Sequence, residues 1–326
     1  PGMFRHVKAI GWFIDEYDCC QVSINFTNHH VSPIHTVVDA IRRVADQEGV
    51  IVTGSELVGL IPLDAMTSAG RYYLTRQGLN PGAPDSELVE TAVRSLGLRD
   101  LTTFEPDERI IERRISRDGR LASMSLRAFS DLLSSSAPAP GGGSVAALCG
   151  SMAAGLASMV GALTTGKKGY DDQQQACIEM AVRAQALREA FLNDVDADTA
   201  AFDGIMTAFA LPKGTQEEKG ARRQAIQDAT RVAIEVPLSV LERTVQVLDA
   251  VDVALTGNAN ARSDAGVAAL LCQACAEGAW YNVRINLDGF KDSEASQSYA
   301  QRSDAALQTV RERVEAATAG VRSQLG

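Results

Sequence analysis

The chain contains 326 residues but has no histidine beyond residue 35. Its four histidines are His6, His29, His30 and His35. Histidine is the side chain that most often transfers protons near neutral pH. Proton transfer by any later segment must therefore use a carboxylate, a lysine, a tyrosine or a hydroxyl group.

Long apolar runs and basic regions are missing as well. No uninterrupted run of about 18 apolar residues occurs, so we expect no transmembrane span and no membrane partner. The first residues do not form a signal peptide. A methionine at position 3, rather than 1, leads us to expect that the chain begins inside a longer protein. Residues 1–118 carry 12 basic and 17 acidic side chains and the later residues carry 19 and 24, which predicts no face for nucleic acid.

The spacing of the six cysteines does not suggest the disulfide framework of a small secreted protein. Cys272 and Cys275 form a single C-x-x-C motif within an alanine-rich helical stretch. A zinc site would need a second pair or nearby histidines. We therefore expect these two cysteines to pack between helices, no bound metal, and a reducing, cytoplasmic location.

Two kinds of periodicity divide the chain. Residues 1–116 mix alternating apolar segments with amphipathic ones, which predicts a small α+β subdomain of ferredoxin-like type. Its expected strands cover residues 7–14, 21–26, 50–52 and 56–61. Its helices are expected to open at Pro33, Pro62 and Asp85.

Residues 121–326 show helical spacing almost throughout, which predicts an all-α helical bundle. Residues 117–120 are the expected linker between the two parts. Small residues recur within 143–165 and permit close approach of neighbouring helices. The expected helices cover residues 121–134, 143–165, 171–209, 216–255, 261–288 and 293–324.

A run of small residues, 137–144, leads directly into the helix expected at 143–165. It reads Ala-Pro-Ala-Pro-Gly-Gly-Gly-Ser and ends with Gly141, Gly142, Gly143 and Ser144. Proline holds the approach extended, and glycine lets the backbone come close to another group. Ser144 lies where free helix N–H groups favour an anion or a polar ligand edge. The alternative is a flexible interdomain linker, although a linker seldom runs straight into so strong a helical pattern.

Asp194 and Asp198 are four residues apart and would share one face of a helix. Two carboxylates held that close, above all when desolvated, raise the pKa of one of them toward values useful in acid catalysis. The alternative is a solvated acidic face, which the spacing alone does not exclude.

Three lysines follow breaks in the helical pattern. Lys167 and Lys168 come directly after Gly166, and Lys213 comes after Pro212. Ammonium groups at these places suit an anionic substrate. Lysines near the end of a helix also suit its negative dipole, so helix capping is the alternative.

Three further polar residues interrupt apolar helical stretches. Asp264 lies at the start of an alanine-rich helix and could be its N-cap. Asn282 and Asn286 are four residues apart, and two amides on an apolar helix face need hydrogen-bond partners. A bound heterocycle is one such partner, and helix–helix hydrogen bonding is the other.

Taken in order, short motifs along the whole chain resemble the formiminotransferase-cyclodeaminase family. The family's transferase also has an amino-terminal subdomain with a catalytic histidine, which has no counterpart here, and we do not assign that role to His29, His30 or His35. Motifs that resemble the carboxyl-terminal subdomain of the family's transferase lie at residues 7–12, 21–23, 54–60 and 108–112. Motifs that resemble its cyclodeaminase lie at residues 138–144, 195–198 with Phe202, 211–213, 262–264 and 281–287.

The resemblance implies an enzyme of folate-dependent one-carbon metabolism in histidine degradation. It would convert 5-formimidoyltetrahydrofolate to 5,10-methenyltetrahydrofolate and ammonia, with no metal. Asp198 is the residue that matches the family's catalytic aspartate, and we expect Asp194 to raise its pKa. The loop 141–144 would admit the pterin or the bridging carbon.

The remaining candidates would bind other parts of the substrate. We expect Lys167, Lys168 and Lys213 to meet the carboxylates of a polyglutamylated folate. Asp264, Asn282 and Asn286 would hydrogen-bond the edges of the pterin. The resemblance also implies a homo-oligomer, a ring of dimers up to an octamer, with the site partly at a subunit boundary.

Residues 1–116 would then be part of a glutamate formimidoyltransferase module, and the longer parent protein would be both lyase and transferase. A methenyltetrahydrofolate cyclohydrolase, which shares the helical domain, is the first alternative. It is less favoured because a cyclohydrolase has no use for a transferase part. A non-catalytic folate-binding or assembly scaffold is the second, and the presence of Asp198 with every polar motif argues against it.

Overall fold

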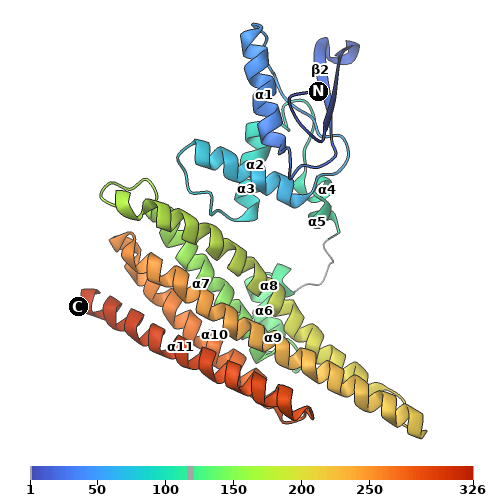
Figure 1. The fold of residues 1–326 in the computed structure, drawn as a ribbon, viewed down its shortest axis with the longest axis vertical. Helices are drawn as coiled ribbons and strands as arrows, with labels where there is room; N and C mark the ends of the chain where they lie inside the picture. Colours follow the sequence, from blue (N-terminus) through green and yellow to red (C-terminus); the bar gives the residue numbers. More distant parts are fainter. Residues whose placement is uncertain (1, 116–120, 326) are drawn as a thin grey trace. The chain divides into compact units, whose positions relative to one another are not determined.

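The computed structural model describes residues 2–115 and 121–325 (Figure 1). The chain divides into two compact units, Pro1–Ser116 and Arg117–Gly326, which we call the first and the second unit. The linker expected at residues 117–120 lies outside the described residues.

The first unit combines a β-hairpin with a small helical core. Strands β1 (Val7–Ile14) and β2 (Cys19–Phe26) are antiparallel, in a register that pairs Val7 with Phe26 and Ile14 with Cys19; η1 (Asp15–Tyr17) joins them. At Gly70 a Cβ would lie 2.6 Å from the carbonyl carbon of Leu88, so α2 and α3 meet backbone to backbone. The helices are α1 (Ile34–Gln47), α2 (Leu63–Arg76), α3 (Asp85–Leu96), α4 (Pro106–Arg109) and α5 (Ile111–Arg114).

The ferredoxin-like sheet expected for this unit is not found. Within the described residues the sheet has two strands, and the segments 50–52 and 56–61, predicted as strands, form none. Only Ile61 makes a β-bridge, a parallel one with Ile110. Val58 is 87% exposed, so the apolar residues of 56–61 do not pack on a sheet. An apolar run predicts a strand only where a neighbouring strand can pair with it.

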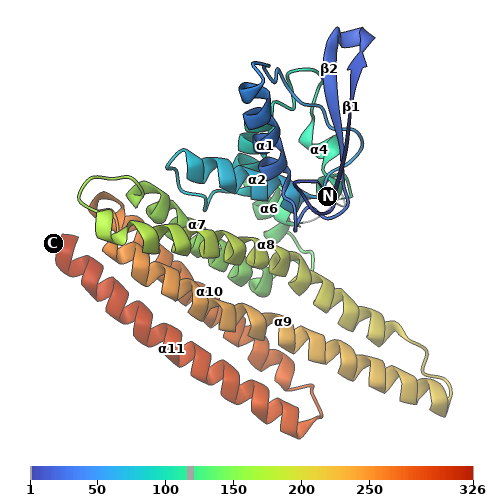
Figure 2. The same cartoon turned by 45° about the horizontal axis from the view of Figure 1, so that its top comes forward.

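The second unit is an all-helical bundle, which confirms the prediction from periodicity (Figure 2). The segment expected as one helix at 121–134 is split into η2 (Leu121–Ser123) and α6 (Leu126–Leu133). Short turns η3 (Asp171–Gln173) and η4 (Ala259–Ala261) precede α8 and α10. The long helices are α7 (Gly142–Thr164), α8 (Gln174–Ala210), α9 (Gln216–Thr256), α10 (Arg262–Leu287) and α11 (Ser293–Leu325).

Helix α7 is the core helix of this bundle. Its small residues let its neighbours come close: a Cβ on Gly150 would lie 2.5 Å from the ring of Phe191 in α8, and one on Gly161 would lie 2.8 Å from the carbonyl oxygen of Cys177. By length and composition α7 could also cross a membrane. However, 56% of its most apolar 18-residue stretch is buried inside the bundle. Packing against other helices therefore accounts for its apolar character.

Three serines seven residues apart fix the register of α7 against α8. Ser144, Ser151 and Ser158 direct their hydroxyl groups to the carbonyl oxygens of Val195, Arg188 and Ala181, at 3.0, 3.2 and 3.4 Å. Both sets repeat every seven residues in opposite directions, as expected for antiparallel helices packed in regular register. The contact of Ser144 with Val195 places the start of α7 against the middle of α8.

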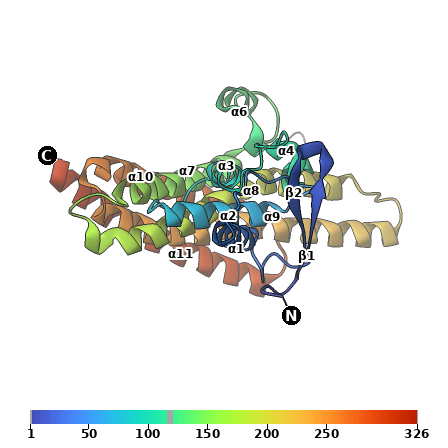
Figure 3. The same cartoon turned by 90° about the horizontal axis from the view of Figure 1, so that it is seen from above.

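Helices α8 and α9 form a long hairpin that runs past the ends of their neighbours (Figure 3). Its turn is closed by a capping box in which the Thr215 hydroxyl accepts from the Glu218 N–H and the Glu218 carboxylate accepts from the Thr215 N–H.

Candidate active site

The first turn of α7 meets the middle of α8 at Ser144 and Asp198. Ser144 is fully buried, and its Oγ lies 3.0 Å from the Val195 carbonyl oxygen, 3.1 Å from Asp198 Oδ2 and 3.4 Å from Thr199 Oγ1. The Ser144 backbone N–H also donates to the Asp198 carboxylate. The anion at the amino end of α7 is therefore the protein's own carboxylate, where the sequence suggested a ligand.

The three glycines before Ser144 have different surroundings. A Cβ on Gly143 would lie 2.5 Å from the Asp198 carboxyl carbon, so this position has no room for a side chain. A Cβ on Gly142 would have only Asn282 Nδ2 within 4 Å, at 3.8 Å, and one on Gly141 would have nothing. Gly143 permits the close approach to Asp198, while Gly141 and Gly142 leave the space beside it open.

Asp198 has a raised pKa, and burial is the cause. Burial favours the neutral carboxyl group, and the hydrogen bonds from the Ser144 hydroxyl and N–H only partly oppose it. The direction agrees with the prediction, but the expected cause does not. Asp194 is not a cause of this rise in pKa, and its own carboxylate is paired with another residue.

That residue is Arg243 of α9, which forms an ion pair with Asp194. The guanidinium also donates to Ser239 Oγ at 3.0 Å and lies 5.4 Å from the ring centroid of Phe191. Burial raises the pKa of Asp194, and the charge of Arg243 opposes that rise. Asp194 therefore ties α8 to α9 one helical turn away from Asp198, and the expectation that it raises the pKa of Asp198 is wrong.

The alternative of a solvated acidic face also fails for this part of α8. Asp196 accepts a hydrogen bond from the Leu121 N–H at 2.7 Å, and Asp194, Asp196 and Asp198 are each partly buried. Each carboxylate has its own partner on a different segment. The acidic run therefore organises the packing around Asp198.

The two asparagines of α10 have different roles. Asn282 is the side chain closest to the space beside Gly142, and its Nδ2 donates to the Gly278 carbonyl oxygen at 2.8 Å. Asn286 Nδ2 donates to the carbonyl oxygens of Ala233 and Asn282, both at 2.9 Å. Asn282 thus joins the candidate site, whereas Asn286 follows the helix–helix alternative and links α10 to α9.

Lys167 and Lys168 lie at the other end of the bundle. They follow the carboxyl end of α7, whereas Ser144 is in its first turn, and the rise of about 1.5 Å per residue places them roughly 30 Å apart. Lys167 donates to Asn258 Oδ1 and lies 5.6 Å from the ring centroid of Tyr170, and Lys168 is exposed. Within one chain they therefore do not meet Asp198, and their expected role in binding the folate carboxylates stays a prediction.

Asp264 and Lys213 are also separate from Asp198. Asp264 is in the first turn of α10, about 27 Å along that helix from Asn282. Lys213 is exposed in the turn after α8, whose end at Ala210 lies about 18 Å beyond Asp198. One chain therefore brings together the glycine run, Ser144, Asp198 and Asn282, and leaves the three lysines and Asp264 elsewhere.

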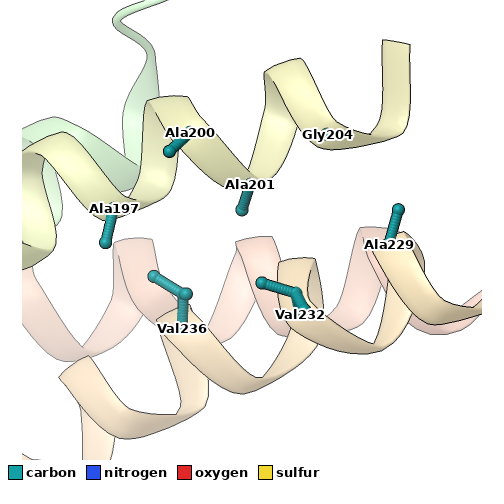
Figure 4. A pocket seen from close by; sticks show the side chains of 7 residues that line it. All are labelled: Ala197, Ala200, Ala201, Gly204, Ala229, Val232 and Val236. Carbon is teal, nitrogen blue, oxygen red and sulfur yellow. The ribbon is translucent and has the colours of Figure 1, made fainter. Parts of the chain in front are cut away.

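A groove beside this cluster was not predicted from the sequence. It lies between α8 and α9, has a volume of about 310 Å³ and is almost entirely apolar (Figure 4). Asp198 is next to Ala197 in sequence but does not line the groove. The sequence feature that could have indicated this groove is the spacing of small residues along α8. The groove is lined by Ala197, Ala200, Ala201, Gly204, Ala229, Val232 and Val236.

Comparison with known proteins gives matches over both units. A family model described as Formiminotransferase-cyclodeaminase matches residues 125–305, and one described as Formiminotransferase domain matches residues 1–116. Formimidoyltransferase-cyclodeaminase of Sus scrofa is 37% identical over 312 residues, which are 94% of this chain and 58% of that protein. The chain thus spans well under two thirds of that relative.

Two further proteins match part of the chain. Methenyltetrahydrofolate cyclohydrolase of Methylorubrum extorquens is 42% identical over 168 residues, 51% of this chain and 81% of that protein. The crystal structure of formiminotetrahydrofolate cyclodeaminase from Thermotoga maritima superposes with a TM-score of 0.52 at 29% identity, over 62% of this chain and 96% of that one. The bundle described above is therefore a fold shared with a solved enzyme.

Proposed function

Because the chain belongs to the formiminotransferase-cyclodeaminase family, we propose that its second unit converts 5-formimidoyltetrahydrofolate to 5,10-methenyltetrahydrofolate and ammonia. The observation that carries this proposal is the Asp198 carboxyl group. It is partly buried against the first turn of α7, and its pKa is raised by that burial. A carboxyl group in this state can take up and release a proton closer to neutral pH than an exposed aspartate.

The reaction needs one proton to move between two nitrogens. The N10 nitrogen of the folate attacks the carbon of the protonated formimidoyl group (an amidinium), a C–N bond forms, and the Asp198 carboxylate takes the N10 proton. Asp198 then gives this proton to the resulting amino group, the bond between that nitrogen and the carbon breaks, and ammonia leaves the methenyl cation. No other co-reactant is required, so a single carboxyl group is sufficient for both steps.

The surrounding residues support this role by position. Ser144 orients the carboxylate through its hydroxyl and N–H groups. Gly141 and Gly142 present no side chains, so a flat substrate can approach over backbone. Asn282, whose Nδ2 would lie 3.8 Å from a Cβ on Gly142, offers an amide for the pterin edge.

The proposal includes a homo-oligomer in which two chains complete one site. It is supported by the separation of the lysines from Asp198 within one chain, because a polyglutamylated folate would need both. The ring of dimers is part of the same proposal. So is a cytoplasmic location, supported by six free cysteines, which stay reduced in such a compartment.

We further propose that the first unit belongs to a glutamate formimidoyltransferase module that produces the formimidoyl substrate from an intermediate of histidine degradation. The match of residues 1–116 to the Formiminotransferase domain supports this. The transferase activity would be that of the longer protein.

A cyclohydrolase is the second candidate, favoured by the 42% identity to the Methylorubrum extorquens enzyme. The two functions differ in substrate and in product. The purified chain should release ammonia from 5-formimidoyltetrahydrofolate faster than it hydrolyses 5,10-methenyltetrahydrofolate. The reverse order of rates would assign cyclohydrolase activity, and binding of folate with neither reaction would assign a scaffold.

A further inference from the structure

The first unit brings together two histidines and one aspartate that the proposed function does not use. His29 Nε2 lies 3.1 Å from both Asp64 Oδ1 and Asp64 Oδ2, and His30 Nε2 lies 3.5 Å from Asp64 Oδ2. One ligand atom from each residue falls within 4.8 Å of the other two. The histidines follow β2 and Asp64 is in the first turn of α2, so 35 residues separate His29 from Asp64 and no short motif reveals the cluster.

Both segments that carry these side chains are held by other hydrogen bonds. Asn28 Oδ1 accepts from the N–H groups of His30 and Val31, at 3.0 and 3.3 Å, which forms a compact turn. The Ser32 hydroxyl donates to the Arg5 carbonyl oxygen at 2.5 Å. These bonds fix the backbone of the histidine segment without occupying the imidazole atoms.

The start of α2 is anchored in the same way. The Leu63 N–H donates to Glu112 Oε2 at 2.7 Å, and Pro62 precedes the helix. Asp64 therefore projects from a backbone position that does not depend on the histidines. A site built from two independently held segments is organised before a ligand arrives.

We propose that His29, His30 and Asp64 bind a divalent transition-metal ion of the Zn²⁺ type. Zinc takes imidazole nitrogen and carboxylate oxygen at about 2.0–2.2 Å, so ligand atoms of a tetrahedral site lie roughly 3.3–3.5 Å apart. The His30–Asp64 separation of 3.5 Å falls within that range, and the His29–Asp64 separation of 3.1 Å is slightly shorter than it. Magnesium and calcium are disfavoured, because they prefer oxygen ligands.

An ordinary ion pair explains only part of this arrangement. An ion pair with Asp64 needs one imidazole, yet the ring centroids of His29 and His30 are 4.1 Å apart and both Nε2 atoms lie within 3.5 Å of the same carboxylate. A metal ion accounts for both rings, because it binds two imidazole nitrogens and one carboxylate oxygen together. Three protein ligands leave a fourth position for water, and His30 and Asp64, at 71% and 53% exposed, let the ion enter and leave.

The test is a Zn²⁺ titration of the full chain by calorimetry, with Co²⁺ absorption as a second readout. Cys19 and Cys20 are the other ligands to control for, so the chain carrying Cys19→Ser and Cys20→Ser is titrated as well. We expect one ion per chain with or without these two cysteines. The Co²⁺ spectrum should lack thiolate charge-transfer bands.

His29→Gln and Asp64→Asn should each weaken binding by more than the roughly tenfold that loss of an outer-shell partner costs. The matched control is His6→Asn, since His6 has a φ of 58° and asparagine tolerates that conformation. Unchanged circular dichroism shows that each variant is folded. Zn²⁺ binding that survives His29→Gln, or that is lost with the two cysteines, would overturn the proposal.

Discussion

The carboxyl group of Asp198 lies so close to Gly143 that a Cβ on this glycine would come within 2.5 Å of the carboxyl carbon. The two residues are on different helices and are joined through Ser144, whose hydroxyl lies 3.1 Å from Asp198 Oδ2. The third glycine of the run is thus needed for packing against the proposed acid–base group. Gly141 and Gly142 have no such contact within the chain, so their lack of a side chain matters only for a ligand that binds beside them.

The different surroundings of Gly143 and Gly141 predict a large effect for an alanine at the first position and a small effect at the second. Gly143→Ala should displace Asp198, lower kcat and destabilise the second unit by about 1–3 kcal/mol, as overpacking of a close contact does. Gly141→Ala is the matched control and should change the free energy of unfolding little, because nothing lies within 4 Å of the added methyl group. Urea unfolding and initial rates on both variants check this. Equal loss of activity in both would contradict it.

The raised pKa of Asp198 predicts a conflict between function and stability. Burial favours the neutral form, so this group stabilises the fold below pH 3.8, and that contribution is lost as the pH rises through the folded-state pKa. Asp198→Asn, which stays neutral, should therefore be more stable than the parent chain at neutral pH and equally stable in strong acid.

Urea unfolding of both chains over a series of pH values measures that difference. Asp203→Asn, at an exposed position of the same helix, is the control and should change stability less. A variant at position 198 that is less stable than the parent at neutral pH would show that burial does not dominate there. In the parent chain the acid limb of kcat/KM should lie above pH 3.8, because catalysis starts from the carboxylate.

The ion pair of Asp194 with Arg243 predicts a strong dependence of each residue on the other. Arg243→Met leaves the partly buried Asp194 carboxylate without its charge partner, which should cost about 1–3 kcal/mol. Adding Asp194→Asn to the same chain should recover much of that loss. Arg302→Met removes an exposed pair with Glu242 and should cost less than about 1 kcal/mol. If Arg243→Met costs no more than Arg302→Met, Asp194 is not held as described.

A site shared between subunits predicts complementation between inactive variants. One preparation carries Asp198→Asn and the other carries both Lys167→Gln and Lys168→Gln. If two chains complete one site, mixing after dissociation should restore about a quarter of the parent activity on a polyglutamylated substrate, since random pairing leaves one intact site in half of the dimers. No recovery in verified mixed oligomers would place each site within one chain.

Sequence patterns predicted the helices of the second unit well because apolar and small residues repeat over long stretches there. They predicted the strands at 50–52 and 56–61 wrongly, because pairing depends on a neighbouring strand that the apolar pattern cannot supply. Asp198 and the glycine run were found from motifs that lie close to one another in the fold. Arg243 was missed because it meets Asp194 across 49 residues of sequence.

The positions of the lysines show the same limit. Lys167 follows a helix whose first turn holds Ser144, and the length of that helix separates them. A list of motif residues contains no information on which of them meet within one chain and which meet across an interface. The direction and length of each helix decide that.

The central claim is that Asp198 carries the proton in cyclodeamination. The most direct measurement mixes the purified chain with 5-formimidoyltetrahydrofolate and follows ammonia together with the absorbance of methenyltetrahydrofolate, for the parent and for Asp198→Asn. We predict equal amounts of both products from the parent, and a loss of turnover in the variant with folate binding retained. Undiminished turnover by Asp198→Asn, or a folded parent chain that binds folate and forms neither product, would contradict the account.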